Sequence, residues 1–216
     1  MTFDISYTFD AMPRLLQGAM VTVQFAVIPL FLSIIIATIV SIVRELGNPI
    51  IEAGIRIYIS FIRGTPLLIQ IFLIYYALPL NLNPVTAGVA ALSINSGAIM
   101  TEIMRGGLSA IPKGQIEAAR SLGLKPWLIW HKIILPQVFI LITPPIVNEF
   151  TLLVKSTSLL AVITVVELFR TAQQIFSSNF RPIEVLLGAA TIYFLINFCA
   201  SKIADVIGKR NAVKMA

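Results

Sequence analysis

The chain has 216 residues, of which 57% are hydrophobic and only 12% are charged. A soluble domain carries roughly twice that share of charged residues, so the composition excludes an ordinary soluble protein and predicts one that folds within a membrane. The net charge of +6 does not indicate nucleic-acid binding, because the basic residues cluster beside long apolar runs, as the positive-inside rule describes.

The start of the chain lacks the pattern of a secretory signal peptide. Asp4 and Asp10 precede the first apolar run, where a signal peptide has a basic segment, so we expect this run to be a retained membrane span. The single cysteine, Cys199, excludes an internal disulfide, and its apolar surroundings indicate a small hydrophobic core residue.

Five apolar segments are each long enough for a helix that crosses a bilayer, which takes about 20 residues. The expected spans are 15–43, 57–80, 85–104, 138–165 and 185–203. Asn81-Leu82-Asn83-Pro84 marks the turn between the second and third spans, and 167–184 is expected to be a polar loop outside the cell. With no internal repeat, the sequence predicts one all-α integral membrane domain over residues 1–216, built as a five-helix bundle.

The positions of the basic residues predict the orientation of the chain in the membrane. They fall in three groups, which are Arg44 and Arg56; Arg105, Lys113, Arg120, Lys125 and Lys132; and Lys202, Lys209, Arg210 and Lys214. Basic loops after the first and third spans, with a basic C-terminal tail, place the N-terminus outside and the C-terminus in the cytoplasm. Five spans do not readily enclose a polar pathway alone, so we expect an identical or related chain as a partner.

The longest polar-rich segment is Glu117 to Pro136. Pro112 and the helix formers after it predict a short helix that Gly123 ends in the left-handed conformation. A second helix is expected from Trp127 to Ile134. The residues alone leave two interpretations open for this helix-turn-helix element at the cytoplasmic face, a docking surface for a partner or an amphipathic loop on lipid headgroups.

The same segment carries a resemblance to a known family. The EAA---G---------I-LP signature of ABC importer permeases is matched at every named position, by Glu117-Ala118-Ala119, Gly123, Ile133, Leu135 and Pro136. The histidine, arginine and glutamine branch of these permeases is resembled in three further segments, which are Arg63 to Leu68, Glu102 to Gly107 and Ile111 to Gln115. A fourth, Lys155 to Leu159, resembles that branch's KDTSL but has Ser156 in place of the aspartate. The resemblance covers nearly the whole chain.

By this resemblance, the fold is that of a type I ABC importer permease in a prokaryotic inner membrane, and the loop 109–136 contains a coupling helix. That helix sits in a cleft of a separate cytoplasmic ATPase, whose closure on ATP rearranges the spans, while an extracytoplasmic binding protein delivers the amino acid. The residues expected at the ATPase contact are Glu117, Ala118, Ala119, Ser121 and Gly123.

The energy source is expected to lie outside this chain. The sequence has no G-x-x-x-x-G-K-[ST] run to hold phosphate. ATP and Mg²⁺ are therefore expected on the partner ATPase, and this chain is expected to be a transport subunit without a cofactor, a metal site or enzymatic activity of its own.

Polar groups inside spans are costly and usually face a cavity or a partner, so they are candidates for substrate contact. Glu149 is suited to the cationic side chain of arginine, lysine or histidine, or else pairs with Lys155 or with an arginine on another helix. At Gly64-Thr65-Pro66 the proline removes a helix hydrogen bond, and the freed backbone carbonyls are expected to face a cavity. The expected substrate-binding residues are Glu149, Arg63, Thr65, Gln70, Asn95 and Thr157.

The prediction is thus a permease subunit of an ATP-driven importer for polar, chiefly basic, amino acids, with the individual amino acid left open. One alternative is an ion-coupled secondary carrier with Glu149 and Glu102 as proton sites, although such carriers usually have repeated halves. Another is an intramembrane hydrolase using Lys155 with Ser156 or Ser158, although neighbours on one helix do not face each other.

Overall fold

The computed structural model describes residues 3–44, 47–77 and 81–213, with side chains as far as residue 206. Residues 78–80, at the end of the expected second span, and Lys214 of the basic tail lie outside the described residues. Every regular element within the described ranges is helical, which confirms the predicted all-α fold.

Four helical segments of the described chain are long and apolar enough to cross a membrane. Three of them are single helices, α1 (Ser6–Arg44), α4 (Pro84–Ser109) and α9 (Pro182–Val213). The fourth runs through α6 (Pro126–Ile129), the π-helical turn η2 (Trp130–Ile134), α7 (Leu135–Ser156) and the 3₁₀ turn η3 (Thr157–Ile163). The π-helical turn ends two residues before Pro136, whose missing N–H interrupts the regular helical ladder.

A fifth crossing results if two helices that meet at a sharp bend are counted as one broken span. α2 (Pro49–Gly64) and α3 (Leu67–Phe72), which continues into the π-helical turn η1 (Leu73–Ala77), are bent by 110° at their junction. Thr65 between them is extended, with ψ of 145°, because a residue before proline is kept out of the helical region. The expected span 57–80 is therefore divided where the sequence predicted a break.

One expectation is wrong, because the segment 167–184 is mostly helical. α8 covers Leu168–Asn179 and packs against α1 and α9. Its buried residues recur at the spacing of one helix face, and they are Leu168, Thr171, Ala172 and Ile175. Glu167 caps its N-terminus, accepting from the amides of Phe169 and Arg170.

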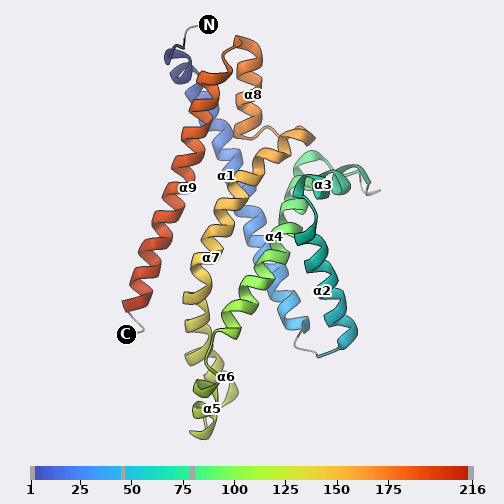
Figure 1. Cartoon of the computed structure of the whole chain (residues 1–216), viewed down its shortest axis with the longest axis vertical. Helices are drawn as coiled ribbons and strands as arrows, with labels where there is room; N and C mark the ends of the chain where they lie inside the picture. Colours follow the sequence, from blue (N-terminus) through green and yellow to red (C-terminus); the bar gives the residue numbers. More distant parts are fainter. Residues whose placement is uncertain (1–2, 45–46, 78–80, 214–216) are drawn as a thin grey trace.

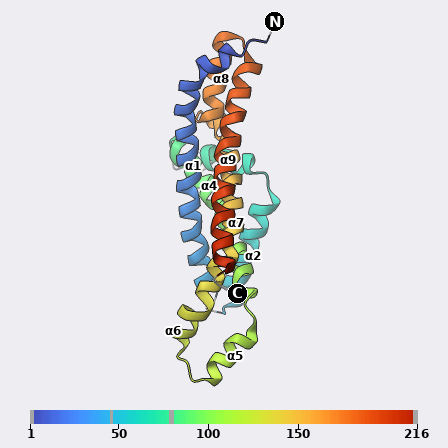
Figure 2. The same cartoon turned by 90° about the vertical axis from the view of Figure 1, so that its left-hand side faces the viewer.

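The helices form an elongated bundle whose two ends differ (Figure 1). α4 packs along α1, and α7 contacts both α4 and α9. The main core is apolar and includes Ala26, Leu92, Val154 and Leu160, each fully buried. The N-terminus and α8 lie at one end, whereas α5 (Lys113–Ser121) and α6 form a tip at the other (Figure 2). The predicted docking loop therefore projects beyond the bundle, away from the N-terminus.

Candidate functional site

The helix α5 ends in a left-handed turn at Gly123, whose φ is +71°. The amide of Leu124 donates to the carbonyl of Ala119 at 3.2 Å, and the amide of Gly123 donates to the carbonyl of Arg120 at 2.9 Å. This pair of bonds satisfies carbonyls that a helix end otherwise leaves free. The left-handed turn predicted at Gly123 is confirmed.

Four of the five residues predicted to contact an ATPase are exposed on α5 and its turn, namely Glu117, Ala118, Ser121 and Gly123. The fifth, Ala119, is only 3% exposed and packs in the chain's own apolar cluster with Ile111 and Ile129. Its small side chain therefore allows α5 to approach its own scaffold, and the expectation that it faces a partner is wrong.

Large apolar side chains are exposed at this tip, and one of them, Leu122, was missed by the sequence reasoning. Leu122 is 80% exposed at the end of α5, and Trp127 is 62% exposed at the start of α6. An apolar residue directly before a helix-ending glycine, in a segment otherwise polar, was the available signal. Such groups at a projecting tip suit burial against a partner protein.

A side-chain hydrogen bond connects the tip to the membrane helices. The side-chain nitrogen of Gln137 on α7 donates to the side-chain oxygen of Gln115 on α5 at 2.8 Å, and also to the backbone carbonyl of Ile133. The tip is therefore joined to the start of α7 by a direct side-chain contact as well as by the connecting chain.

A second polar cluster lies at the bend between α2 and α3 and unites three of the predicted substrate residues. The side-chain nitrogen of Gln70 donates to the hydroxyl of Thr65 at 2.9 Å, and the oxygen of Gln70 accepts from Asn95 on α4 at 2.9 Å. The same nitrogen also contacts the carbonyls of Ile62 at 2.8 Å and Thr65 at 3.1 Å. These carbonyls were expected to be free for a substrate, and that expectation is wrong for both of them.

The hydrogen bonds of this cluster do not include the other three predicted substrate residues. Glu149 on α7 is 3% exposed and lies beside Ser96 on α4, whose hydroxyl is buried without a well-formed hydrogen bond. Thr157 is fully buried, and its hydroxyl donates to the carbonyl of Val154. Arg63 is exposed on α2. Within the described residues, hydrogen bonds thus join three of the six residues in one cluster and leave the other three outside it.

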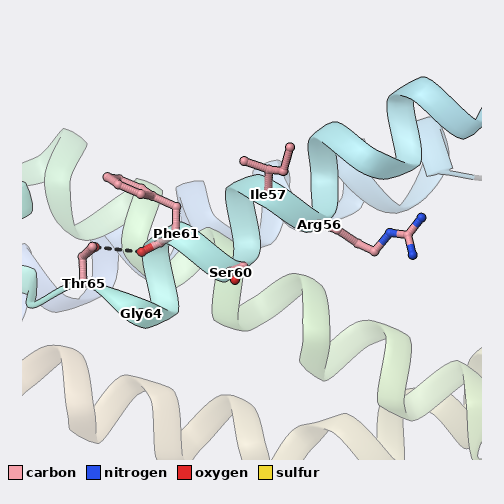
Figure 3. Close-up of a pocket in the computed structure, with 6 residues that line it drawn as sticks. All are labelled: Arg56, Ile57, Ser60, Phe61, Gly64 and Thr65. Carbon is pink, nitrogen blue, oxygen red and sulfur yellow. Dashed lines mark hydrogen bonds between the residues drawn. The ribbon is translucent and has the colours of Figure 1, made fainter.

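A shallow groove of about 550 Å³ runs along α2 (Figure 3). Its lining residues all belong to α2 and the residue after it, and they are Arg56, Ile57, Ser60, Phe61, Gly64 and Thr65. The hydroxyl of Thr65 donates to the carbonyl of Phe61 at 2.8 Å. The Arg56 side chain lies at the other end of the groove and points away from Thr65 (Figure 3). A groove walled by one helix does not enclose a ligand.

Comparison with known proteins identifies the family. Residues 30–213 match the family model described as the binding-protein-dependent transport system inner membrane component. The chain belongs to this family. The match includes the broken span and the whole projecting tip, so both are parts of a multi-pass inner-membrane transport component, which is not an enzyme.

Three relatives are similar over nearly their full length. The glutamine transport system permease protein GlnP of Escherichia coli (strain K12) is 37% identical over 215 residues, which are 97% of this chain and 98% of that protein. The L-cystine transport system permease protein TcyB of Bacillus subtilis (strain 168) is 38% identical, with 92% and 86% covered. The octopine transport system permease protein OccM of Rhizobium meliloti is 35% identical, with 96% and 89% covered.

Solved structures agree with the fold. A crystal structure of an amino acid ABC transporter with histidines is 33% identical, with a TM-score of 0.90, and the match covers 97% of this chain and 100% of that one. An inward-facing MetNI methionine ABC transporter is 20% identical with a TM-score of 0.69 over 91% and 97%, which supports the fold alone. The predicted type I ABC importer permease fold and the resemblance to amino-acid permeases are confirmed.

Proposed function

We propose that this chain is the permease subunit of an ATP-driven importer for polar amino acids, with basic amino acids as the favoured substrates. The observation that carries the proposal is the projecting helix α5, which presents Glu117, Ala118 and Leu122 to the surroundings at one end of a membrane bundle. Relatives named for glutamine, octopine and cystine transport support an amino-acid substrate.

The tip that carries α5 faces the cytoplasm and docks on the ATPase, which holds ATP and Mg²⁺. The basic residues Lys113, Arg120, Lys125 and Lys132 near it support this orientation, which places the N-terminus outside the cell. Movement of the docked α5 then reaches α7 through the bond between Gln115 and Gln137.

The pathway is completed by a second permease chain, identical or closely related. The one-sided groove along α2 supports this arrangement, since a facing chain supplies its missing wall. An amino-acid-binding protein delivers the substrate to the end of the bundle that carries α8 and the N-terminus.

The residue proposed to recognise a basic side chain is Glu149. Its carboxylate lies between α7 and α4 beside Ser96 and is 3% exposed, so a substrate reaches it only when the packing between these helices opens. Alternating access of the spans provides such an opening. Arg63, Thr65, Gln70, Asn95 and Thr157 are proposed to shape the pathway, and the bonds of Gln70 favour support of the bend over direct substrate contact.

The alternative is an ion-coupled carrier, which the burial of Glu149 as a candidate proton site favours. The second proton site of that model is Glu102, and its carboxylate pairs with Arg105 at 2.7 Å. A carboxylate held by an arginine is poorly suited to take up a proton, which weakens this alternative.

Reconstitution of the chain with its ATPase and binding protein in liposomes separates the two functions. The importer predicts uptake that requires ATP inside and continues when the proton gradient is collapsed. Replacing Glu117 or Gly123 by alanine is expected to uncouple hydrolysis from uptake. Uptake driven by a proton gradient without the ATPase would instead establish the carrier. Arginine, histidine, lysine and glutamine supplied in turn identify the substrate by their stimulation of hydrolysis.

A further inference from the structure

A small cleft of about 120 Å³ lies at the end of the bundle that carries the N-terminus. It forms where the turn from α8 to α9 meets the segment before α1, and these elements share one end of the molecule (Figure 1). Its rim holds three large apolar side chains, Phe3, Phe180 and Ile183, which are 57%, 69% and 64% exposed. Apolar surface that the described part of the chain leaves uncovered therefore surrounds the cleft.

Polar contacts beneath this rim hold its two segments together. The backbone amide of Asp4 donates to the carboxylate of Glu184 at 3.4 Å, and the hydroxyl of Thr8 donates to the backbone carbonyl of Glu184 at 2.8 Å. Arg181 also pairs with Glu184 at 3.3 Å, and its guanidinium lies 4.6 Å from the centre of the Tyr7 ring. The chain's own contacts thus fix the rim, and a fixed surface loses less entropy when it binds a partner.

The backbone of Phe180 is left-handed, with φ of 57° and ψ of 31°, at the end of α8. This conformation is most readily adopted by glycine, with asparagine and aspartate next, and it is unfavourable for a bulky side chain. The aromatic ring of Phe180 is mostly exposed, so neither the turn nor the core of the chain accounts for it. Strained residues of this kind gather at functional sites, which makes this rim a candidate contact.

The cleft lies beyond the apolar run of α1. The helices α1 and α9 begin at the same end and run in the same direction (Figures 1 and 2), and the bond between Thr8 and Glu184 sets the cleft beside the first turn of α1. Arg14, the last charged residue before the apolar run, is exposed and lies about 9 Å further along the helix than Thr8, at 1.5 Å per residue. Phenylalanine, unlike tryptophan and tyrosine, has no polar group to place among lipid headgroups. The rim therefore suits a protein surface better than a lipid.

We propose that this cleft is a docking site for the extracytoplasmic amino-acid-binding protein and receives an apolar side chain of that protein. The family to which the chain belongs is described as dependent on a binding protein. With the N-terminus outside the cell, an orientation that rests on the proposed function, the binding protein meets this end of the bundle. Exposed aromatic side chains around a preformed pocket are typical anchors of a protein interface, and Phe180 is the anchor here.

Surface plasmon resonance tests the proposal, with the complete transporter in nanodiscs and the same amino-acid-binding protein as in the liposome reconstitution. Phe180→Asn removes the ring but keeps a residue that tolerates the left-handed turn, so the chain should stay folded while binding weakens at least about tenfold. Phe9→Asn is the matched control, since Phe9 is 65% exposed at the same end but lies on α1, outside the cleft. The control should bind as the unchanged chain does. Equal losses in both variants, or no loss with Phe180→Asn, would overturn the proposal.

Cross-linking identifies the occupant directly. A photo-reactive amino acid in place of Ile183 should capture the binding protein, whereas capture of lipid alone or of a second permease chain would refute the docking site. Normal binding by Phe180→Asn together with intact ATP-dependent uptake would show that only the docking site is wrong. If the unchanged chain neither binds the binding protein nor imports an amino acid with ATP, the proposed function fails and the docking site fails with it.

Discussion

The side-chain nitrogen of Asn95 on α4 donates a 2.9 Å hydrogen bond to the side-chain oxygen of Gln70 on α3. The nitrogen of Gln70 in turn donates to the carbonyls of Ile62 and Thr65 on the other side of the 110° bend. One glutamine that is 4% exposed thus joins both halves of a broken helix and fastens them to α4. In a bilayer, where water does not reach these carbonyls, such internal bonds are what permit the break.

Gln70→Leu is expected to destabilise the protein by about 1–3 kcal/mol, because buried polar groups lose their partners while interhelical bonds in membranes are individually modest. The measurement is the midpoint of thermal unfolding in detergent. Gln17→Leu, at an exposed position on α1, makes the same chemical change without losing such bonds and should leave the midpoint unchanged. Equal midpoints for both variants would contradict the role of Gln70.

The bend itself could be predicted from the sequence, but its partners could not. Proline after Gly64-Thr65 removes a backbone donor at a known place, so the break follows from local chemistry. Which group satisfies the carbonyl of Ile62 depends on how the chain returns after the bend. Gln70 lies eight residues later, and only a 110° turn brings its side chain back to α2.

The helix α8 is a second element that the sequence alone did not predict. Its apolar spacing from Leu168 to Ile175 is visible in the sequence, but the segment is too polar for a span, and the sequence alone predicts a loop there. The role of Glu167 is a tertiary property, because its carboxylate accepts from Tyr193 on α9 at 2.8 Å as well as from two amides of α8. Those contacts decide that the segment folds back against the bundle.

Glu167→Ala should therefore be among the more damaging single substitutions. The carboxylate is fully buried, and its removal leaves two helix N–H groups and the hydroxyl of Tyr193 without an acceptor. A loss of about 2–4 kcal/mol in the free energy of unfolding is expected from the lost cap and the unpaired donors. Chemical denaturation in mixed micelles provides the measurement.

A double-mutant cycle isolates one of these bonds. Tyr193→Phe removes the hydroxyl, so it should cost less when Glu167 is already alanine. Tyr76→Phe, at a position that is 69% exposed, is the control and should be additive with Glu167→Ala. Additivity in both cycles would show that Tyr193 and Glu167 are not coupled.

Adjacent glycines in α4 are expected to respond in opposite directions to alanine. A Cβ on Gly107 would collide with the Cγ2 methyl of Ile142, which is buried on α7, so Gly107→Ala should cost about 1–3 kcal/mol through overpacking. A Cβ on Gly106 meets nothing within 4 Å, and Gly106→Ala should stabilise the helix by about 0.5–1 kcal/mol. Thermal unfolding of both variants under one condition provides the comparison, and equal shifts would show that α4 and α7 do not approach closely at Gly107.

Glu149→Gln tests the proposed contact with a basic substrate. A carboxylate that binds a cation inside the bundle contributes more binding free energy than a neutral amide does. Arginine uptake should therefore fall about ten- to a hundredfold. Uptake of glutamine, if it is also a substrate, is the internal control because its side chain carries no charge. Membrane insertion and assembly with the ATPase should be preserved, and unchanged arginine affinity would remove Glu149 from the site.

Leu122→Ser tests the contact that the sequence reasoning missed. Leu122 is 80% exposed at the end of α5, and burial of a leucine against a partner contributes about 1.5–3 kcal/mol. The variant should therefore weaken binding of the ATPase at least about tenfold and raise the ATP hydrolysed per amino acid imported, while thermal stability of the isolated chain stays the same. Ile50→Ser provides the matched control, since Ile50 is also 80% exposed but lies on α2. Both changes remove an exposed aliphatic group. A loss of ATPase binding with Leu122→Ser alone places the ATPase contact on α5. Equal losses with both variants would show that the effect comes from surface hydrophobicity in general.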